Sequence, residues 1–276
     1  MYTILKAKLD MKKTLESGQV FRYVDQFPYF ILQDKDRQVV VEERKEDYLL
    51  HGDESDLPYW IRYFDLARDY DTYHRTWRWN PVLERAYEYG KGIRILRQDP
   101  FETMITFILS ANSHVPRIKQ SVESLCRHWG RYIDGTYPYY TFPSPKDLAK
   151  GSIKEFRELA KVGYRDRYVY ETAQKVASKE VDLKQLETLQ TKDLIKKLKD
   201  CPGVGEKVAQ CIALFGFGRL EGFPIDVWMK KMLLQGLGEE KIPKDPVEFG
   251  KRTIGEGAGL AQQYYFYYIR TKGEWK

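Results

Sequence analysis

The sequence predicts an α+β protein in which an N-terminal antiparallel sheet domain, residues 1–85, packs on a mostly helical domain, residues 86–276. Residues 29–33 and 38–43 are short runs rich in β-branched and aromatic side chains, and turn-forming residues separate them. From about Leu57 onward, helix start signals replace this pattern. The length of 276 residues exceeds that of one minimal domain, which also favours two units.

Helix start signals recur along the second part. A capping side chain followed by a proline at the first helical position occurs at Asp99-Pro100, Ser144-Pro145 and Asp245-Pro246. Ser152 and Glu155 have the spacing of a capping box, and Gly163 is typical of the end of that helix. We therefore expect this region to be mostly helical.

The composition limits the classes of protein that this chain can belong to. Lysine and arginine number 46 against 40 acidic residues, so the net charge of +6 favours polyanionic partners such as nucleic acid. Hydrophobic residues make up 42% of the chain, which is typical of a globular protein. No apolar run reaches the ~18–20 residues that span a bilayer. Charges near Met1 also interrupt any signal-peptide core, so we expect a cytoplasmic protein.

The three cysteines argue against metal and redox sites. Cys126, Cys201 and Cys211 are odd in number and widely spaced, so a disulfide framework is not expected. Three thiolates are too few for a four-thiolate zinc site or an iron–sulfur cluster within one chain. The expectation is therefore no metal site and no cofactor.

Residues 191–215 carry the most informative pattern. A first helix is expected to end near Asp200, and Gly203, Val204 and Gly205 form a tight turn into a second helix. Glycines on both sides of an apolar residue let the backbone approach an anion, and the free amides of the next helix start point toward it. The pattern predicts a phosphate-binding helix-hairpin-helix; an ordinary helical hairpin with glycine caps has the same pattern.

Lys207 stands in the first turn of the second helix, where acidic residues are normally preferred. It precedes Cys211 by four residues and so lies at the margin of the face expected to be buried. Burial and the helix end both disfavour an ammonium ion, and a lysine with a lowered pKa is an amine nucleophile. The sequence thus indicates a catalytic lysine; the ordinary interpretation is a solvent-facing one.

Asp226 precedes another amphipathic stretch, nineteen residues after Lys207. Its ordinary interpretation is a helix N-cap. A carboxylate fixed at a helix start is also held in one direction, and the intervening helix and loop are long enough to bring it back to Lys207. An amine and an aspartate together would supply a nucleophile and an electrostatic or proton-transfer partner.

These motifs resemble those of a known family. The segment 201–209 followed by 223–227 is similar to the helix-hairpin-helix, glycine/proline-rich loop and aspartate signature of the DNA glycosylase superfamily, and a lysine at position 207 is typical of its bifunctional branch. Within that branch the chain resembles an 8-oxoguanine DNA glycosylase/abasic lyase with an N-terminal sheet domain. Further motifs follow in the family order: Ser17–Arg22, Ser110–Asn112 with Arg117, Gly163–Tyr168, and Gly259–Gln262 with Phe266.

The resemblance implies a catalytic pair. Lys207 would attack the sugar C1′ of the damaged nucleotide, expel the base and form a Schiff base that leads to strand cleavage by β-elimination. Asp226 would stabilise the developing positive charge and orient the reacting groups.

The resemblance also implies a set of residues that recognise the base. Gly18 would offer its carbonyl to the N7 hydrogen that oxidised guanine has and guanine lacks, so one hydrogen bond would carry the discrimination. Phe266 and Cys211 would sandwich the extruded base, and Gln262 would bind its pairing edge. The plain alternatives are a turn glycine at position 18 and core packing for Phe266 and Cys211.

A third implied group would hold the duplex. Asn112 would fill the gap left by the extruded base, and Tyr164 would wedge beside it, while Arg117 and Arg165 would contact the unpaired cytosine. A helix C-cap is the alternative for Asn112, and a solvated or phosphate-binding side chain is the alternative for both arginines.

The chain departs from eukaryotic members of this family at two places. Ser113 and His114 follow Asn112 where eukaryotic members have asparagines, and Trp228 stands where they have histidine. The bacterial members are therefore the nearer match.

The expected protein is a monomeric, cytoplasmic and nucleoid-associated repair enzyme. Its expected partner is damaged double-stranded DNA, and no association with a membrane is expected. Two alternatives remain at the level of sequence: a noncatalytic helix-hairpin-helix DNA-binding module, and a lysine-bearing glycosylase for another lesion.

Overall fold

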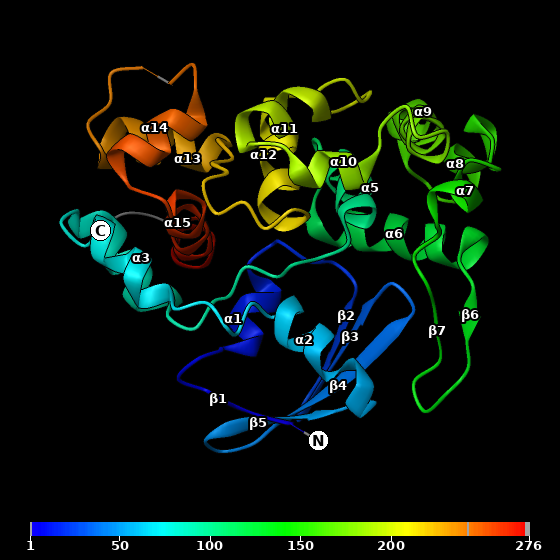
Figure 1. The fold of residues 1–276 in the computed structure, drawn as a ribbon, viewed down its shortest axis with the longest axis horizontal. Coiled ribbons are helices and arrows are strands. Elements are labelled where there is room, and N and C mark those ends of the chain that lie inside the picture. The colour runs from blue at the N-terminus through cyan, green and yellow to red at the C-terminus, as the bar shows by residue number, and fades with distance from the viewer. Residues whose placement is uncertain (1, 242, 274–276) are drawn as a thin grey trace.

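A five-stranded antiparallel sheet forms the N-terminal part of the computed structural model, which describes residues 2–241 and 243–273 (Figure 1). The strand order is β1-β5-β4-β3-β2. The strands are β1 (Tyr2–Leu5), β2 (Tyr23–Gln26), β3 (Tyr29–Asp34), β4 (Arg37–Glu43) and β5 (Asp47–His51). The prediction of an antiparallel sheet is confirmed, and β3 and β4 coincide with the two predicted runs. The sequence pattern did not reveal β1, β2 and β5, which are only four or five residues long.

Helices α1 (Met11–Glu16) and α2 (Leu57–Tyr63) pack on this sheet through one apolar core. Phe30 of β3, Val41 of β4, Leu15 of α1 and Trp60 of α2 all belong to this core and are almost fully buried. Burial of one face of the sheet fixes the register of its strands, because a slip by one residue would turn the apolar side chains outward.

The remaining described chain is mostly helical, as predicted (Figure 1). Its helices before the hairpin are α3 (Tyr70–Trp77), α4 (Pro81–Gly90), α5 (Pro100–Ser110), α6 (Val115–Trp129), α7 (Pro145–Leu148), α8 (Ile153–Glu158), α9 (Asp166–Ala177) and α10 (Leu183–Thr188). The later ones are α11 (Thr191–Leu198), α12 (Glu206–Phe215), α13 (Val227–Lys231), α14 (Pro246–Thr253) and α15 (Ala258–Lys272). Short turns add η1 (Glu54–Asp56), η2 (Gly163–Arg165) and the π-helical η3 (Met232–Gly236).

The predicted start signals are present at the helix ends. Asp99, Ser144 and Asp245 each accept a hydrogen bond from a backbone amide of the following helix. Ser152 and Glu155 form both hydrogen bonds of the capping box. These caps satisfy amides that have no partner within the helix, so they fix where each helix begins.

Two details of the helical part differ from the sequence interpretation. The capping-box helix α8 ends at Glu158, and Gly163, with a φ of 64°, begins the turn η2 instead of ending α8. A second, two-stranded sheet made of β6 (Tyr132–Ile133) and β7 (Tyr139–Tyr140) lies between α6 and α7 in the chain. Its strands are too short to leave a period-two pattern in the sequence.

In the helical core, α12 packs against α5, and Leu214 of α12 lies beside Gly259 of the last helix, α15. Phe107 of α5 stacks on Phe215 of α12 with ring centroids 5.4 Å apart, and Cys211 and Ile212 of α12 are buried in the same core. The helical core also includes Phe21, from the chain just before β2, while the sheet core includes Leu96. Each core therefore includes a side chain from the other part of the chain. The division between residues 85 and 86 stays a prediction.

None of the helices in the described ranges is long and apolar enough to cross a membrane.

The start of α15 provides a test of this packing. A Cβ at Gly259 would lie 2.3 Å from the Gly222 carbonyl oxygen. We expect Gly259→Ala to lower the free energy of unfolding by about 2 kcal/mol, measured by urea denaturation, because the backbone must move apart. Gly52→Ala is the control, since its Cβ would have no atom nearer than 3.8 Å, and it should change the value by less than about 0.5 kcal/mol. Equal stability of the two variants would contradict the close approach.

Candidate active site

The predicted hairpin joins α11 to α12. Gly203 has a φ of 79°, and a Cβ there would lie 2.8 Å from the ring of Tyr168, so the position requires glycine. Val204 is buried beneath the turn. Gly205 is the exposed N-cap of α12, and no side chain caps the helix start. The first amides of α12 therefore face outward next to a glycine with open space around it, as a phosphate-binding hairpin requires.

Lys207 follows in the first turn of α12 and is half-buried. Its Nζ lies 5.5 Å from the centroid of the Phe107 ring. Cys211, one turn further along the helix, lines the same pocket. Burial raises the pKa of the Cys211 thiol, and nearby Lys207 opposes this shift only in part, so the thiol stays protonated.

Asp226 is the N-cap of α13, as its ordinary interpretation requires. Its Oδ1 accepts hydrogen bonds from the backbone amides of Trp228 at 3.0 Å and Met229 at 2.9 Å. Both hydrogen bonds end on one oxygen and hold the carboxylate in a single orientation. The side chain is half-buried and points into the same pocket as Lys207.

This pocket brings together residues from distant parts of the chain. It has a volume of about 40 Å³ and is lined by Gly18, Phe107, Lys207, Cys211, Phe215, Pro224, Asp226, Gln262, Gln263 and Phe266. The predicted catalytic pair and all four predicted base-recognition residues are among them. Because ligand pockets usually measure about 300–1,000 Å³, this pocket must widen before a purine fits.

Gln262 and Gly18 present polar atoms without partners on the walls of the pocket. Gln262 is 4% exposed, and its buried Oε1 has no hydrogen-bond partner. A buried acceptor without a donor is unfavourable, which indicates that a ligand supplies the donor. Gly18 has a φ of 81°, and a Cβ there would lie 3.1 Å from the ring of Phe266. The absence of a side chain therefore lets the Gly18 backbone line the pocket.

The four residues predicted to hold the duplex form a separate cluster. Asn112, exposed and with a φ of 49°, follows the end of α5. The hydroxyl of Tyr164 donates to the carbonyl of Ala111 at 3.3 Å, and the guanidinium of Arg165 donates to the same carbonyl. Arg117 is adjacent, because a Cβ at Gly163 would lie 3.2 Å from its Nη2.

The positions of Arg165 and Asn112 differ from the plain alternatives given for them. Arg165 is 3% exposed, so it is not a solvated arginine, and any contact with a base must compete with the Ala111 carbonyl. Asn112 lies one residue beyond Ala111, the C-cap of α5, so its left-handed conformation belongs to the helix end. Tyr164 is 57% exposed.

Comparison with known families covers most of the chain. Residues 1–104 match the model of the 8-oxoguanine DNA glycosylase N-terminal domain, and residues 105–249 match the model of the HhH-GPD superfamily of base excision DNA repair proteins. The chain belongs to the 8-oxoguanine DNA glycosylase family.

Individual relatives agree with this assignment. The probable N-glycosylase/DNA lyase of Methanothermobacter thermautotrophicus is 34% identical over 232 residues, which cover 76% of this chain and 73% of the relative. The structure of MBOgg1 with a low-affinity DNA ligand has a TM-score of 0.92 at 35% identity and covers 99% of this chain and 96% of that one. The Clostridium acetobutylicum 8-oxoguanine glycosylase/lyase, bound to duplex DNA with cytosine opposite 8-oxoguanine, has a TM-score of 0.91 at 32% identity, with coverages of 97% and 94%.

Sequence reasoning did not assign Phe107, Phe215, Pro224 and Gln263 to the site of this 8-oxoguanine DNA glycosylase. Phe107 and Phe215 belong to apolar runs that any core helix has, so nothing in the sequence distinguished them. Gln263 did leave a signal, because two adjacent glutamines in an otherwise apolar and aromatic helix indicate buried amides with partners.

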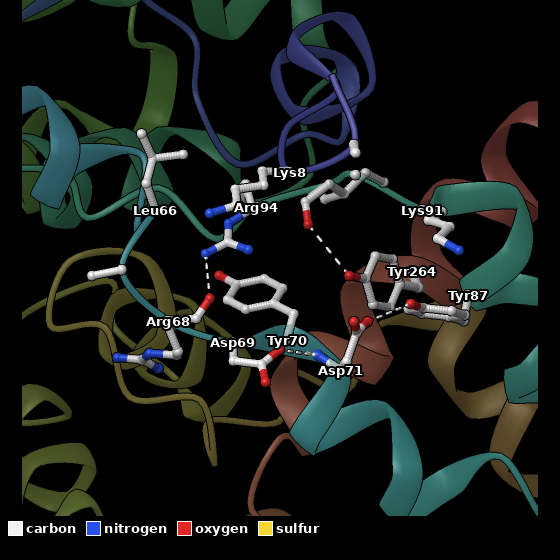
Figure 2. Close-up of a pocket in the computed structure, with 14 residues that line it drawn as sticks. Lys8, Leu66, Arg68, Asp69, Tyr70, Asp71, Tyr87, Lys91, Arg94 and Tyr264 are labelled. Atoms are coloured by element: carbon white, nitrogen blue, oxygen red, sulfur yellow. Dashed lines mark hydrogen bonds between the residues drawn. The ribbon is translucent and has the colours of Figure 1, made fainter. Parts of the chain in front are cut away.

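A second cavity lies away from this pocket (Figure 2). It has a volume of about 290 Å³ and none of the predicted site residues lines it. Its polar groups bond to one another: Arg94 donates to the carbonyl of Arg68 at 2.8 Å, and the hydroxyl of Tyr87 donates to Asp71 at 3.0 Å, as Figure 2 shows. This cavity is therefore a gap between packed elements of the glycosylase, and hydrogen bonds join those elements.

Among the described residues, no group of three or more histidine, cysteine, aspartate or glutamate side chains is placed to hold a metal ion. The three cysteines are free and buried.

Asp226 variants separate its role as a cap from its role in chemistry. Asp226→Ala should lower the free energy of unfolding by about 1 kcal/mol through loss of the cap, whereas Asp226→Asn should retain the stability because asparagine caps equally well. Both should lower base excision about 100-fold or more, since neither has a carboxylate in the pocket. Denaturation and single-turnover kinetics give the two readouts. Excision by Asp226→Asn at a rate close to that of the wild type would show that Asp226 acts only as a helix cap.

Proposed function

We propose that this protein is a bifunctional DNA glycosylase/abasic lyase that excises 8-oxoguanine from duplex DNA by base flipping, in base excision repair. The observation that carries the proposal is the pocket that holds Lys207 and Asp226 together with Gly18, Gln262 and Phe266. A noncatalytic DNA-binding hairpin would require neither the amine and carboxylate in one pocket nor a buried acceptor without a partner.

Lys207 supplies the nucleophile. As a neutral amine its Nζ attacks C1′, the bond from C1′ to the base breaks, and the base leaves with the bonding electrons and takes up a proton. Loss of the ring oxygen from C1′ then gives the Schiff base, and removal of a C2′ proton expels the 3′ phosphate by β-elimination. Asp226, held at the start of α13, stabilises the positive charge that develops on the sugar and on the Schiff base.

The base is recognised by backbone and neutral side-chain groups. The Gly18 carbonyl accepts the N7 hydrogen of 8-oxoguanine; guanine presents a lone pair there, and two acceptors repel. The unpartnered Oε1 of Gln262 accepts from a donor on the pairing edge of the base. Phe266 and the protonated thiol of Cys211 lie on its two faces.

The duplex is held by the cluster at the end of α5 and at η2. Extrusion of a nucleotide costs a few kcal/mol of stacking and pairing, which inserted side chains offset. In this proposal the exposed side chains of Asn112 and Tyr164 insert into the gap, and the neighbouring Arg117 and Arg165 contact the unpaired cytosine. The hairpin of Gly203, Val204 and Gly205 binds the phosphate backbone.

The site is complete within one chain, so we infer that the enzyme acts as a monomer. The proposed substrate, duplex DNA, favours a location at the nucleoid in the cytoplasm.

Borohydride trapping tests the proposed chemistry. The wild-type protein should form a covalent adduct with duplex DNA that contains 8-oxoguanine, because borohydride reduces the Schiff base, and Lys207→Gln should form none. Lys196→Gln, which removes an exposed lysine of α11, is the control and should retain the adduct. Gel electrophoresis under denaturing conditions gives the readout.

Each competing function has its own result in this assay. No adduct from the wild-type protein, with equal binding of intact and damaged duplex, would support a noncatalytic binding module. Adducts only with other damaged duplexes would indicate a different lesion. An adduct that persists in Lys207→Gln would show that another amine is the nucleophile.

Salt dependence tests the contact with the phosphate backbone. With about six phosphate contacts, affinity for duplex DNA should fall roughly 1,000-fold between about 50 and 200 mM salt, because bound counterions are released. Arg117→Gln should lower the affinity but leave the slope of log K against log salt nearly unchanged, because the proposed Arg117 contact is with the unpaired cytosine and not with a phosphate. Arg127→Gln, whose guanidinium is paired with Glu123 at 2.9 Å, should change neither the affinity nor the slope. A flat response of the wild type would contradict the proposed footprint.

A further inference from the structure

The turn that carries Gly18 is held on both sides by glutamine side chains. Before it, Nε2 of Gln263 donates to the carbonyl of Ser17 at 2.7 Å, and Gln263 is only 2% exposed. After it, Nε2 of Gln98 donates to the carbonyl of Gln19 at 2.8 Å. The peptide planes on the two sides of the Gly18 carbonyl are therefore each fixed by a buried hydrogen bond.

The side chain of Gln19 anchors the turn to the body of the protein. It is fully buried, its Nε2 donates to the carbonyl of Arg94 at 2.8 Å, and its Oε1 accepts from the amide of Leu96 at 2.8 Å. Gln19 therefore cannot shift without breaking several buried hydrogen bonds, each of which is costly to leave unmade.

The carbonyl of Gly18 belongs to the one peptide group between these fixed planes. Glycine rotates freely about its backbone bonds, so without restraint this carbonyl would sample several directions. Its reorientation requires a concerted change of the dihedral angles on both sides, and the hydrogen bonds from Gln263 and Gln98 oppose it. No hydrogen bond found among the described residues uses the Gly18 carbonyl itself, so it is available to a ligand.

We propose that Gln263 is a positioning residue that determines specificity, because it holds the Gly18 carbonyl in the direction that distinguishes 8-oxoguanine from guanine. This inference rests on the proposed role of Gly18. Gln263 reaches the turn from α15, the helix that also carries Gln262 and Phe266. One helix thus sets the distance between the part of the site that binds the pairing edge and the part that reads N7.

The test uses Gln263→Met, which keeps the length and volume of the side chain but removes the amide donor. Three readouts are measured. The first is the affinity ratio for 8-oxoguanine over guanine, on duplexes whose sugar is 2′-fluorinated to prevent cleavage; the others are kcat/KM for 8-oxoguanine excision and the cleavage of a preformed abasic site. We expect the ratio, and kcat/KM for 8-oxoguanine excision, to fall about tenfold, which is the effect of one well-placed hydrogen bond. Abasic-site cleavage needs only Lys207 and Asp226, so it should stay within about twofold.

Gln174→Met is the matched control, because it removes another amide that donates to a backbone carbonyl at 2.7 Å, that of Ala149. It should leave the ratio unchanged. If Gln263→Met does not fold, Gln98→Met loosens the same turn from the other side and should give the same selective loss.

An unchanged ratio in the folded variant, or an equal fall in excision and abasic-site cleavage, would overturn the positioning role. A fall of the same size in Gln174→Met would also overturn it, since the effect would then be one of general stability. Failure of the proposed function looks different: the wild-type protein would cleave abasic sites without excising 8-oxoguanine, and the inference would fall with it.

Discussion

The fixed rotation of helix α12 is the constraint on which the rest of the site depends. Eight consecutive residues, from Val208 to Phe215, are buried, and Phe215 stacks on Phe107 of the neighbouring helix. A helix advances about 100° per residue, so a shift of one position would turn Lys207 away from the pocket. Dense packing along α12 prevents that shift, and the amine is therefore held in the pocket that Asp226 also lines.

The pocket is lined by residues from two parts of the molecule: the helical core and the connection between α1 and β2. Lys207 and Asp226 come from the helical core, whereas Gly18 comes from the connection between α1 and β2. Gln263 ties that connection to α15 through one buried hydrogen bond. In the proposed site, the carbonyl that reads N7 and the amine that attacks C1′ are thus built on separate elements, and the contact between those elements decides whether they act on the same nucleotide.

Most polar groups of the pocket are neutral. A carbonyl, an amide and a protonated thiol can surround a purine without the desolvation cost of burying further charges. In the proposed mechanism the charged pair acts at the sugar, where positive charge develops during the reaction. Under that proposal, one small pocket both selects the base and supplies the amine that attacks C1′.

The sequence by itself determined the local structure and the candidate chemistry. Capping residues fixed the helix starts, glycines fixed the hairpin, and motif order indicated the family, because these signals depend on neighbours in the chain. Only the tertiary structure decided that Lys207 and Asp226 line one pocket, that Gln262 keeps an unpartnered oxygen, and that Gln263 holds the turn at Gly18. Such contacts join residues far apart in the chain, and the packing of buried helices sets them, which no spacing along the sequence records.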